Sequence, residues 1–150
     1  MDILLQDFQT PFDTVPFSNI DTTQFTAAVK IALESAQDDI DAITNNNESA
    51  TFDNTIAALD YSGQKLGRVS RIFFNLNSAE TNDNLQSQAA EIGPILTAFQ
   101  NDIIMNSGLF ARIKRVYNNR DQQEYSSEER ILLEKTYKRF VRNGALLNNV

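Results

Sequence analysis

Apolar side chains recur every three or four residues in each long segment of this 150-residue chain. The most regular segment places Leu85, Ala89, Ile92, Leu96, Phe99 and Ile103 in a 4-3-4-3-4 series. This spacing follows the 3.6-residue turn of an α-helix, so these side chains would form one buried stripe. The same period in every segment predicts an all-α fold, an antiparallel bundle of about five helices, built from one domain over residues 1–150.

Local sequence signals give the expected limits of these helices. The pattern predicts helices over residues 25–43, 51–76, 81–103, 109–117 and 126–144. The expected N-terminal caps are Thr22 or Thr23, Thr51, Thr81, and Ser126 with Glu129 at capping-box spacing. Gly144 is expected to end or bend the last helix.

Three features modify this simple series of helices. Gly63 and Gly67 are costly inside a helix, so close approach of a neighbouring helix is expected there. Pro94 removes one backbone hydrogen bond and is expected to kink the third helix without ending it. The second and third helices are expected to join at Ser78 to Thr81.

The first 22 residues do not follow the helical pattern. They contain Pro11, Pro16 and several aromatic residues in "PFDTVPFSNID". Because proline disfavours helix and aromatic side chains prefer burial, residues 1–22 are expected to form an extended arm. Phe12 and Phe17 are expected to pin it to the helices.

The chain contains no cysteine and no histidine. Their absence excludes disulfides, thiolate zinc sites and nucleophiles activated by histidine. No glycine-rich phosphate loop and no nucleophile elbow occurs either. We therefore predict no catalytic residue, no metal ligand and no cofactor within this chain.

Charge and hydropathy limit the partners of the chain. Its net charge of −7 argues against nucleic acid as a partner. No apolar run is long enough to span a bilayer, and the opening "MDILLQDFQTPFD" lacks the features of a signal peptide. These features predict a soluble, cytoplasmic protein without a membrane partner. An export signal on a longer precursor would lie outside this sequence.

The stretch "FFNLNSAETND" could present a polar binding surface. Asn75, Asn77 or Glu80 would then contact a substrate. Capping at a tight turn between two helices explains nearly every residue of the stretch and is the simpler interpretation. The substrate-binding residues are therefore left unassigned.

Other charged groups have a possible function beside a simpler explanation. Asp38 to Asp41, "DDID", could bind a hard cation, although a solvated helix face explains the carboxylates better. Two basic groups could hold a peptide carboxylate: Arg68 with Arg71, and Lys135 with Lys138 and Arg142. Ordinary surface charge is the commoner reason for such groups.

Four stretches together resemble one protein family: "PFDTVPFSNI", "TFDNTIAALDYSG", "FFNLNSAETND" and "LLEKTYKRFVRNGALL". In order and spacing they are similar to the amino-terminal region of bacterial peptidyl-dipeptidases, also called dipeptidyl carboxypeptidases. These enzymes belong to the thimet oligopeptidase and neurolysin family of zinc metallopeptidases. The resemblance covers almost the whole chain and implies a helical domain of a neurolysin-like enzyme.

The family resemblance implies a noncatalytic role for this chain. Family members carry H-E-x-x-H and a downstream glutamate in a catalytic zinc domain, and this chain has none of these residues. Its helices would form one wall of the channel that admits short peptides to an enzyme removing dipeptides from the C-terminus. The implied partner is the catalytic domain of the same polypeptide. The alternative is a free-standing helical adaptor or interaction domain without peptidase activity.

The resemblance has a further consequence for the surface of the isolated chain. If the catalytic domain is missing, apolar residues that it would cover are exposed, including Leu146, Leu147 and Val150. Large exposed apolar patches favour association. Self-association through the last helix is therefore expected.

Overall fold

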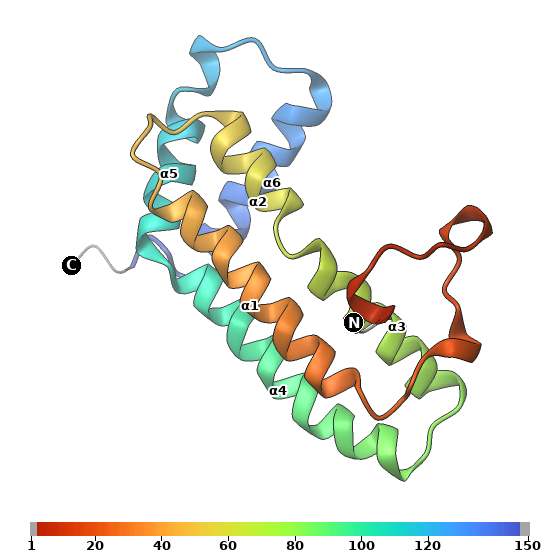
Figure 1. Cartoon of the computed structure of the whole chain (residues 1–150). Helices are drawn as coiled ribbons and strands as arrows, with labels where there is room; N and C mark the ends of the chain where they lie inside the picture. Colours follow the sequence, from red (N-terminus) through yellow and green to blue (C-terminus); the bar gives the residue numbers. More distant parts are fainter. Residues whose placement is uncertain (1–2, 148–150) are drawn as a thin grey trace. The chain divides into compact units, whose positions relative to one another are not determined.

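The computed structural model of the chain describes residues 3–147, which form helices and turns but no strand (Figure 1). The predicted all-α class is confirmed. The helices are α1 (Phe25–Thr44), α2 (Ala58–Tyr61), α3 (Gln64–Ala79), α4 (Asp83–Met105), α5 (Ser107–Asn118) and α6 (Ser127–Arg142). No helix among the described residues is long and apolar enough to cross a membrane.

The described residues divide into two compact units, and each is considered by itself. The first unit combines the residues up to 37 with residues 63–98, and the second combines residues 38–62 with those from 99 onward. The unit boundaries fall within α1, between α2 and α3, and within α4.

The core of the first unit forms between α1, α3 and the first part of α4. The ring of Phe25, at the start of α1, meets that of Phe73 edge to face with centroids 5.1 Å apart. Gly63, which precedes α3, lies beside Ala36, further along α1. α1 and α3 therefore run in opposite directions. Between α1 and α4, Lys30 forms an ion pair with Glu91 at 2.6 Å, and the amide of Thr26 donates a hydrogen bond to Gln88. These contacts show that α1 and α4 run in the same direction.

The N-terminus of α1 is capped by a residue from another helix. The amide of Thr26 donates to Oε1 of Gln88 at 3.0 Å, and Nε2 of Gln88 donates to the carbonyl of Thr22 at 2.6 Å. The expected cap at Thr22 or Thr23 is therefore wrong. The hydroxyl and amide of Thr23 instead donate to Asp21, and these bonds lower the pKa of its carboxyl group.

The segment expected as one helix over residues 51–76 is broken, so that prediction is wrong. A π-helical segment, Phe52–Ala57, leads into α2, and the helical conformation is then interrupted at Ser62, which is extended, and at Gly63 before α3 begins. Gly63 adopts the left-handed conformation with φ +66°, which costs a residue with a Cβ atom more than glycine. The N-terminal cap at Thr51 is confirmed as a capping box with Asn54.

The glycines of this segment are not explained by close approach of a neighbouring helix. A Cβ at Gly63 would lie 3.5 Å from Cβ of Ala36, which is ordinary contact, so positive φ is the reason for glycine there. At Gly67 the nearest atom would be Nη1 of Arg71, from the same helix, at 3.2 Å. The expectation of helix crowding is wrong at both positions.

We expect Gly63→Ala to destabilise the chain by about 1–2 kcal/mol, because alanine strains the left-handed conformation. Gly93→Ala is the matched control, since its Cβ would meet nothing within 4 Å inside α4. Higher helix propensity should stabilise that variant by roughly 0.5–1 kcal/mol. Urea unfolding measures both variants. Shifts of the same sign would contradict the conformational explanation.

The stretch between α3 and α4 is a short turn, as the simpler interpretation expected, but it lies later than predicted. α3 continues to Ala79. Oδ1 of Asn82 accepts from the amide of Leu85 at 2.9 Å, so Asn82 caps α4 where Thr81 was expected. α4 continues through Pro94 without ending, as expected, and the kink there stays a prediction.

The second unit is built around α5 and α6. Its buried cluster consists of Ile40, Ile43, Ile56, Leu109, Phe110, Ile113, Val116, Leu133 and Phe140. The ring of Phe110 stacks on Phe140 and on Tyr137, with centroids 6.0 and 5.9 Å away, and Tyr137 stacks on Tyr117 at 3.8 Å. This row of rings joins the two helices along their length.

Local signals correctly predicted both ends of α6. Ser126 and Glu129 form the expected capping box. At the other end Gly144 has φ +89°, and the amide of Ala145 donates to the carbonyl of Phe140 at 3.2 Å. This is the arrangement of a Schellman C-cap, so the expected termination at Gly144 is confirmed.

A polar network holds the loop between α1 and the π-helical segment. Oδ1 of Asn54 accepts from the amide of Thr51, the hydroxyl of Thr55 and Nη2 of Arg112, at 2.9, 2.9 and 3.0 Å. Arg112, from α5, also donates to the carbonyls of Asn46 and Glu48 at 2.7 and 3.0 Å. Thr55 is completely buried. The "TFDNT" stretch therefore has a structural role.

Candidate functional site

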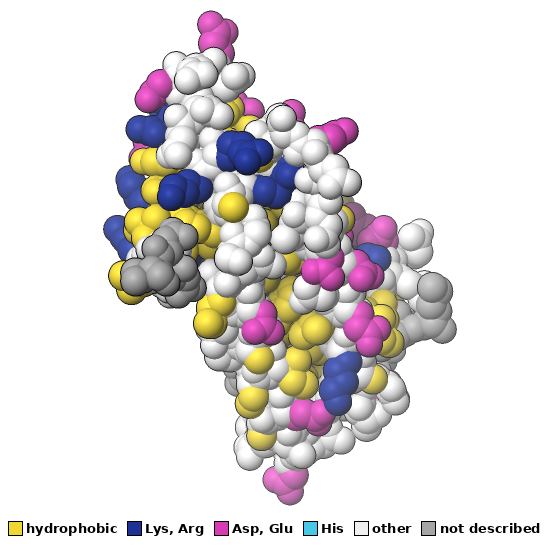
Figure 2. All heavy atoms as spheres, turned by 90° about the vertical axis from the view of Figure 1, so that its left-hand side faces the viewer, with side chains coloured by type: hydrophobic (Ala, Val, Ile, Leu, Met, Phe, Trp, Pro, Cys, Tyr) yellow, Lys and Arg dark blue, Asp and Glu magenta, His cyan; other side chains and the backbone are white. Residues whose placement is uncertain are grey.

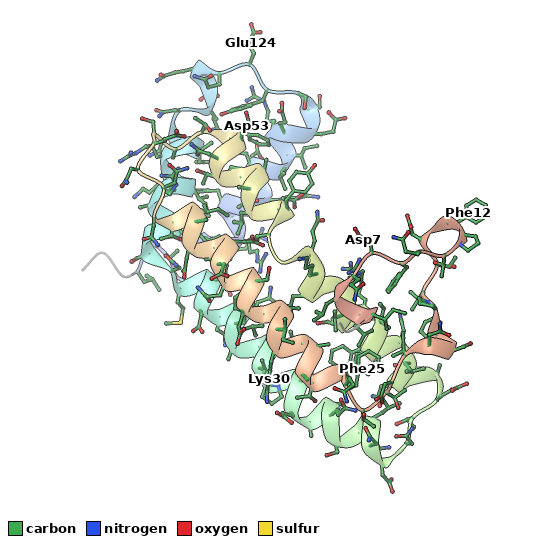
Figure 3. The ribbon with its side chains drawn as sticks, in the orientation of Figure 1. Asp7, Phe12, Phe25, Lys30, Asp53 and Glu124 are labelled. Carbon is green, nitrogen blue, oxygen red and sulfur yellow. The ribbon has the colours of Figure 1, made fainter. Side chains whose placement is uncertain are left out.

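The arm (described residues 3–22) packs on the first unit through residues other than those expected. Leu4, Phe8 and Ile20 are buried, whereas Phe12 is 98% exposed and projects from the tip of the arm (Figure 3). Phe17 is also half exposed. The expectation that Phe12 and Phe17 pin the arm is therefore wrong. The arm also contains three short 3₁₀ turns, so it is not simply extended.

Arg68 of α3 fastens the arm to the helices. Its Nη2 donates to the carbonyl of Gln6 at 2.8 Å, its Nη1 lies 3.2 Å from Oδ1 of Asp7, and its guanidinium covers the ring of Phe8 at 5.1 Å. Figure 3 shows Asp7 on the side of the arm that faces α3. The Nη1 and Nη2 donors of Arg68 therefore both bind the arm.

We expect Arg68→Met to lower the free energy of local opening of the arm by about 2 kcal/mol. The variant loses the hydrogen bonds from a charged donor and the cation–π contact with Phe8. Methionine keeps much of the side chain's apolar packing. Hydrogen exchange of the amides in residues 3–20 should accelerate, while the second unit keeps its protection. Lys65→Met, an exposed change one turn earlier, is the control. Equal protection of the arm in both variants would contradict this role.

A hollow of about 590 Å³ lies between the arm and α3 and is called the arm–α3 hollow. Its lining residues are Asp7, Phe8, Asp13, Val15, Phe17, Arg68, Arg71, Ile72 and Asn75. A second hollow of about 450 Å³ shares Asp7, Arg68 and Arg71 and adds Gln64 and Lys65. The larger volume falls within the range of small-molecule sites, about 300–1,000 Å³.

Three polar side chains of the arm–α3 hollow are not used by the fold. Within residues 3–147, the side chains of Asp13, Arg71 and Asn75 make no hydrogen bond or ion pair. All three are exposed. The guanidinium of Arg71, the carboxylate of Asp13 and the amide of Asn75 can therefore bind a ligand beside the apolar lining of the hollow.

The structure therefore places some of the candidate binding residues from the sequence in one hollow and others elsewhere. Arg68, Arg71 and Asn75 line one hollow, as their spacing on one helix face allows. Asn77 instead accepts from the hydroxyl of Thr81 at 3.2 Å in the turn. Glu80 lines a smaller, mainly apolar hollow with Phe17 and Asn75.

The remaining candidates do not form sites. Asp38, Asp39 and Asp41 are exposed, and no group of three acidic side chains in the described part of the chain could hold a metal ion. Lys135, Lys138 and Arg142 are exposed on α6, where Lys138 pairs with Glu134 at 3.0 Å and lowers the pKa of that carboxyl group. Figure 2 shows Lys and Arg side chains gathered on one face of the second unit.

A further hollow of about 410 Å³ in the second unit has an acidic character. Asp53 and Glu124, labelled in Figure 3, line it together with Glu129. Phe52 and Tyr125 also line it, and their rings lie 5.4 Å apart. Burial raises the pKa of Tyr125, and the negative charges of Glu129 and Asp53 raise it further. Tyr125 is therefore a neutral hydroxyl at neutral pH.

Sequence reasoning missed the residues that the arm contributes to the arm–α3 hollow. Asp7, Phe8 and Asp13 lie more than 50 positions before α3, so no helical spacing relates them to Arg71. An acidic and aromatic arm preceding a basic helix face is the one signal that could have suggested the pairing.

These observations define an all-α protein whose first unit carries a hollow of mixed charge and apolar lining. No family model matches the chain. It is 34% identical, over 144 residues and 96% of its length, to a dipeptidyl carboxypeptidase of Salmonella typhimurium (strain LT2). It is 35% identical, over 137 residues and 91% of its length, to a dipeptidyl carboxypeptidase of Escherichia coli (strain K12). The chain spans 21% and 20% of these two relatives, about a fifth of their length.

Proposed function

We propose that this chain is a noncatalytic helical part of a dipeptidyl carboxypeptidase. The observation that carries this proposal is coverage: the two relatives match 96% and 91% of the chain, and the matched part is only about a fifth of each relative. In this proposal the chain is the amino-terminal helical domain, and its helices form one wall of the channel that leads short peptides to the catalytic domain of the same polypeptide. That domain would remove dipeptides from the peptide C-terminus.

The composition of the chain supports a catalytic zinc site that lies in another part of the parent enzyme. Zinc in proteins is held by histidine, cysteine and carboxylate ligands, and the chain has neither histidine nor cysteine. Its described residues also hold no cluster of acidic side chains suited to a metal. Zinc, the cofactor proposed for the parent enzyme, would therefore be held outside this chain.

The surface expected for self-association is partly described. Leu146 is 41% exposed and Leu147 is 78% exposed, and Val150 lies outside the described residues. Exposed leucines at this position agree with a face that packs on another domain or copy. Self-association through these residues stays a prediction.

A domain exchange tests the proposed function. The 144 matching residues of the Salmonella typhimurium relative are replaced by those of this chain, and release of dipeptides from a short blocked peptide is measured. We expect the chimera to release dipeptides and the isolated chain to release none, with or without added zinc. A folded but inactive chimera would contradict the proposal, because a compatible wall domain should restore the channel. A gene without a downstream H-E-x-x-H would favour the free-standing adaptor.

A further inference from the structure

We propose that the arm–α3 hollow is a binding site for the carboxylate of a short peptide, with Arg71 as its anchor. This site is a property of the first unit itself and does not rest on the activity of a parent enzyme.

The first argument is the different use of two neighbouring arginines. Arg68 and Arg71 are separated by three positions on α3 and line the same hollow. Arg68 donates to Asp7 and to backbone carbonyls of the arm. Arg71 makes no hydrogen bond or ion pair with any residue that the structure describes. Its planar guanidinium is therefore free to receive a carboxylate through two parallel bonds.

The second argument is the local balance of charge. Three basic side chains, Lys65, Arg68 and Arg71, line the two adjoining hollows together with two acidic ones, Asp7 and Asp13, which leaves one positive charge in excess. The whole chain, in contrast, has a net charge of −7. A locally positive hollow on an acidic protein attracts anions and disfavours cations.

The third argument is the character of the walls. Phe8, Val15, Phe17 and Ile72 supply an apolar lining. Asn75 lies four positions after Arg71 on the same helix face and has unused amide donors and an acceptor. A peptide end that presents a carboxylate, an amide and an apolar side chain satisfies all three kinds of lining group. An inorganic anion would leave the apolar wall without a partner.

Titration followed by NMR tests the site on the full chain. The probe is N-acetyl-Ala-Ala-Phe with a free carboxylate, added to ¹⁵N-labelled protein. We expect shift changes confined to amides of the arm and α3. Binding should weaken roughly tenfold in Arg71→Gln, which keeps a polar side chain but loses the charged donor. Arg142→Gln makes the same charge change on α6 and should leave binding unchanged.

Two further peptides identify the source of the carboxylate. N-acetyl-Ala-Ala-Phe-amide has no carboxylate and should lose binding. N-acetyl-Ala-Glu-Phe-amide carries the carboxylate on a side chain only. If it binds with the same dependence on Arg71, the site takes carboxylates of either source; if it does not bind, the site is specific for a peptide C-terminus. Both results support a carboxylate site.

A second variant has an effect of the opposite sign. Asp13→Asn removes an unpaired negative charge from the hollow, so binding of N-acetyl-Ala-Ala-Phe should tighten by about two- to fivefold. The proposal is overturned if no peptide causes shifts localised to the arm and α3. Equal binding of the uncharged amide, or unchanged binding in a folded Arg71→Gln protein, would overturn it as well.

Discussion

Phe73→Ala is expected to destabilise the chain by about 3–5 kcal/mol, the usual cost of removing a buried aromatic side chain. Phe73 is completely buried on α3, and its ring lies 5.1 Å from the rings of both Phe25 and Phe74. The substitution leaves a cavity at the centre of the first unit and removes the edge-to-face contact with α1. Urea denaturation followed by circular dichroism measures the loss.

Phe12→Ala provides the matched control, because it removes the same side chain from a position that is 98% exposed. We expect a change within about 0.5 kcal/mol. If Phe12→Ala instead destabilised the chain as much as Phe73→Ala, the arm would be pinned through Phe12 after all. That result would contradict the arrangement in which Phe8 is buried and Phe12 is not.

Asn54→Ala is expected to destabilise the chain by about 3 kcal/mol. The change removes one half of the capping box at Thr51, worth about 1 kcal/mol. It also leaves the buried hydroxyl of Thr55 and one donor of Arg112 without their acceptor, which costs about 1–3 kcal/mol. Thermal unfolding and hydrogen exchange of residues 45–57 report the loss.

Two companion variants separate this network from a general effect of losing an asparagine. Asn54→Asp keeps the acceptors and adds attraction to Arg112, but loses the donor to the carbonyl of Ser49, so it should cost only about 1 kcal/mol. Asn47→Ala, at an exposed position of the same loop, should change stability by less than about 0.5 kcal/mol. Similar losses in all three variants would show that the network around Asn54 is not specific.

The helical class and several helix ends could be predicted because their causes are local. The 3.6-residue period requires only the order of apolar residues along one segment. The capping boxes at Thr51 and Ser126 join residues three positions apart, and Gly144 ends α6 through bonds within the same turn. Such interactions form in nearly the same way whatever the rest of the chain does.

The features that could not be predicted depend on partners far apart in the sequence. The cap of α1 comes from Gln88, 62 positions after the amide that it accepts from. The break at Gly63 was hidden because the apolar period continues across it, and only packing decides between a costly helical glycine and a turn.

The candidate site shows the same division most clearly. The sequence by itself determined that Arg68 and Arg71 share a helix face, that the chain lacks histidine and cysteine, and that an aromatic arm precedes the helices. Only the tertiary structure decided that Phe8 is buried and Phe12 exposed. It also decided that Arg68 binds the arm, whereas Arg71 lines the same hollow without a hydrogen-bond partner among the described residues. The reason is physical: two arginines or two phenylalanines have equal intrinsic preferences, and the contacts of the folded chain alone assign them different roles.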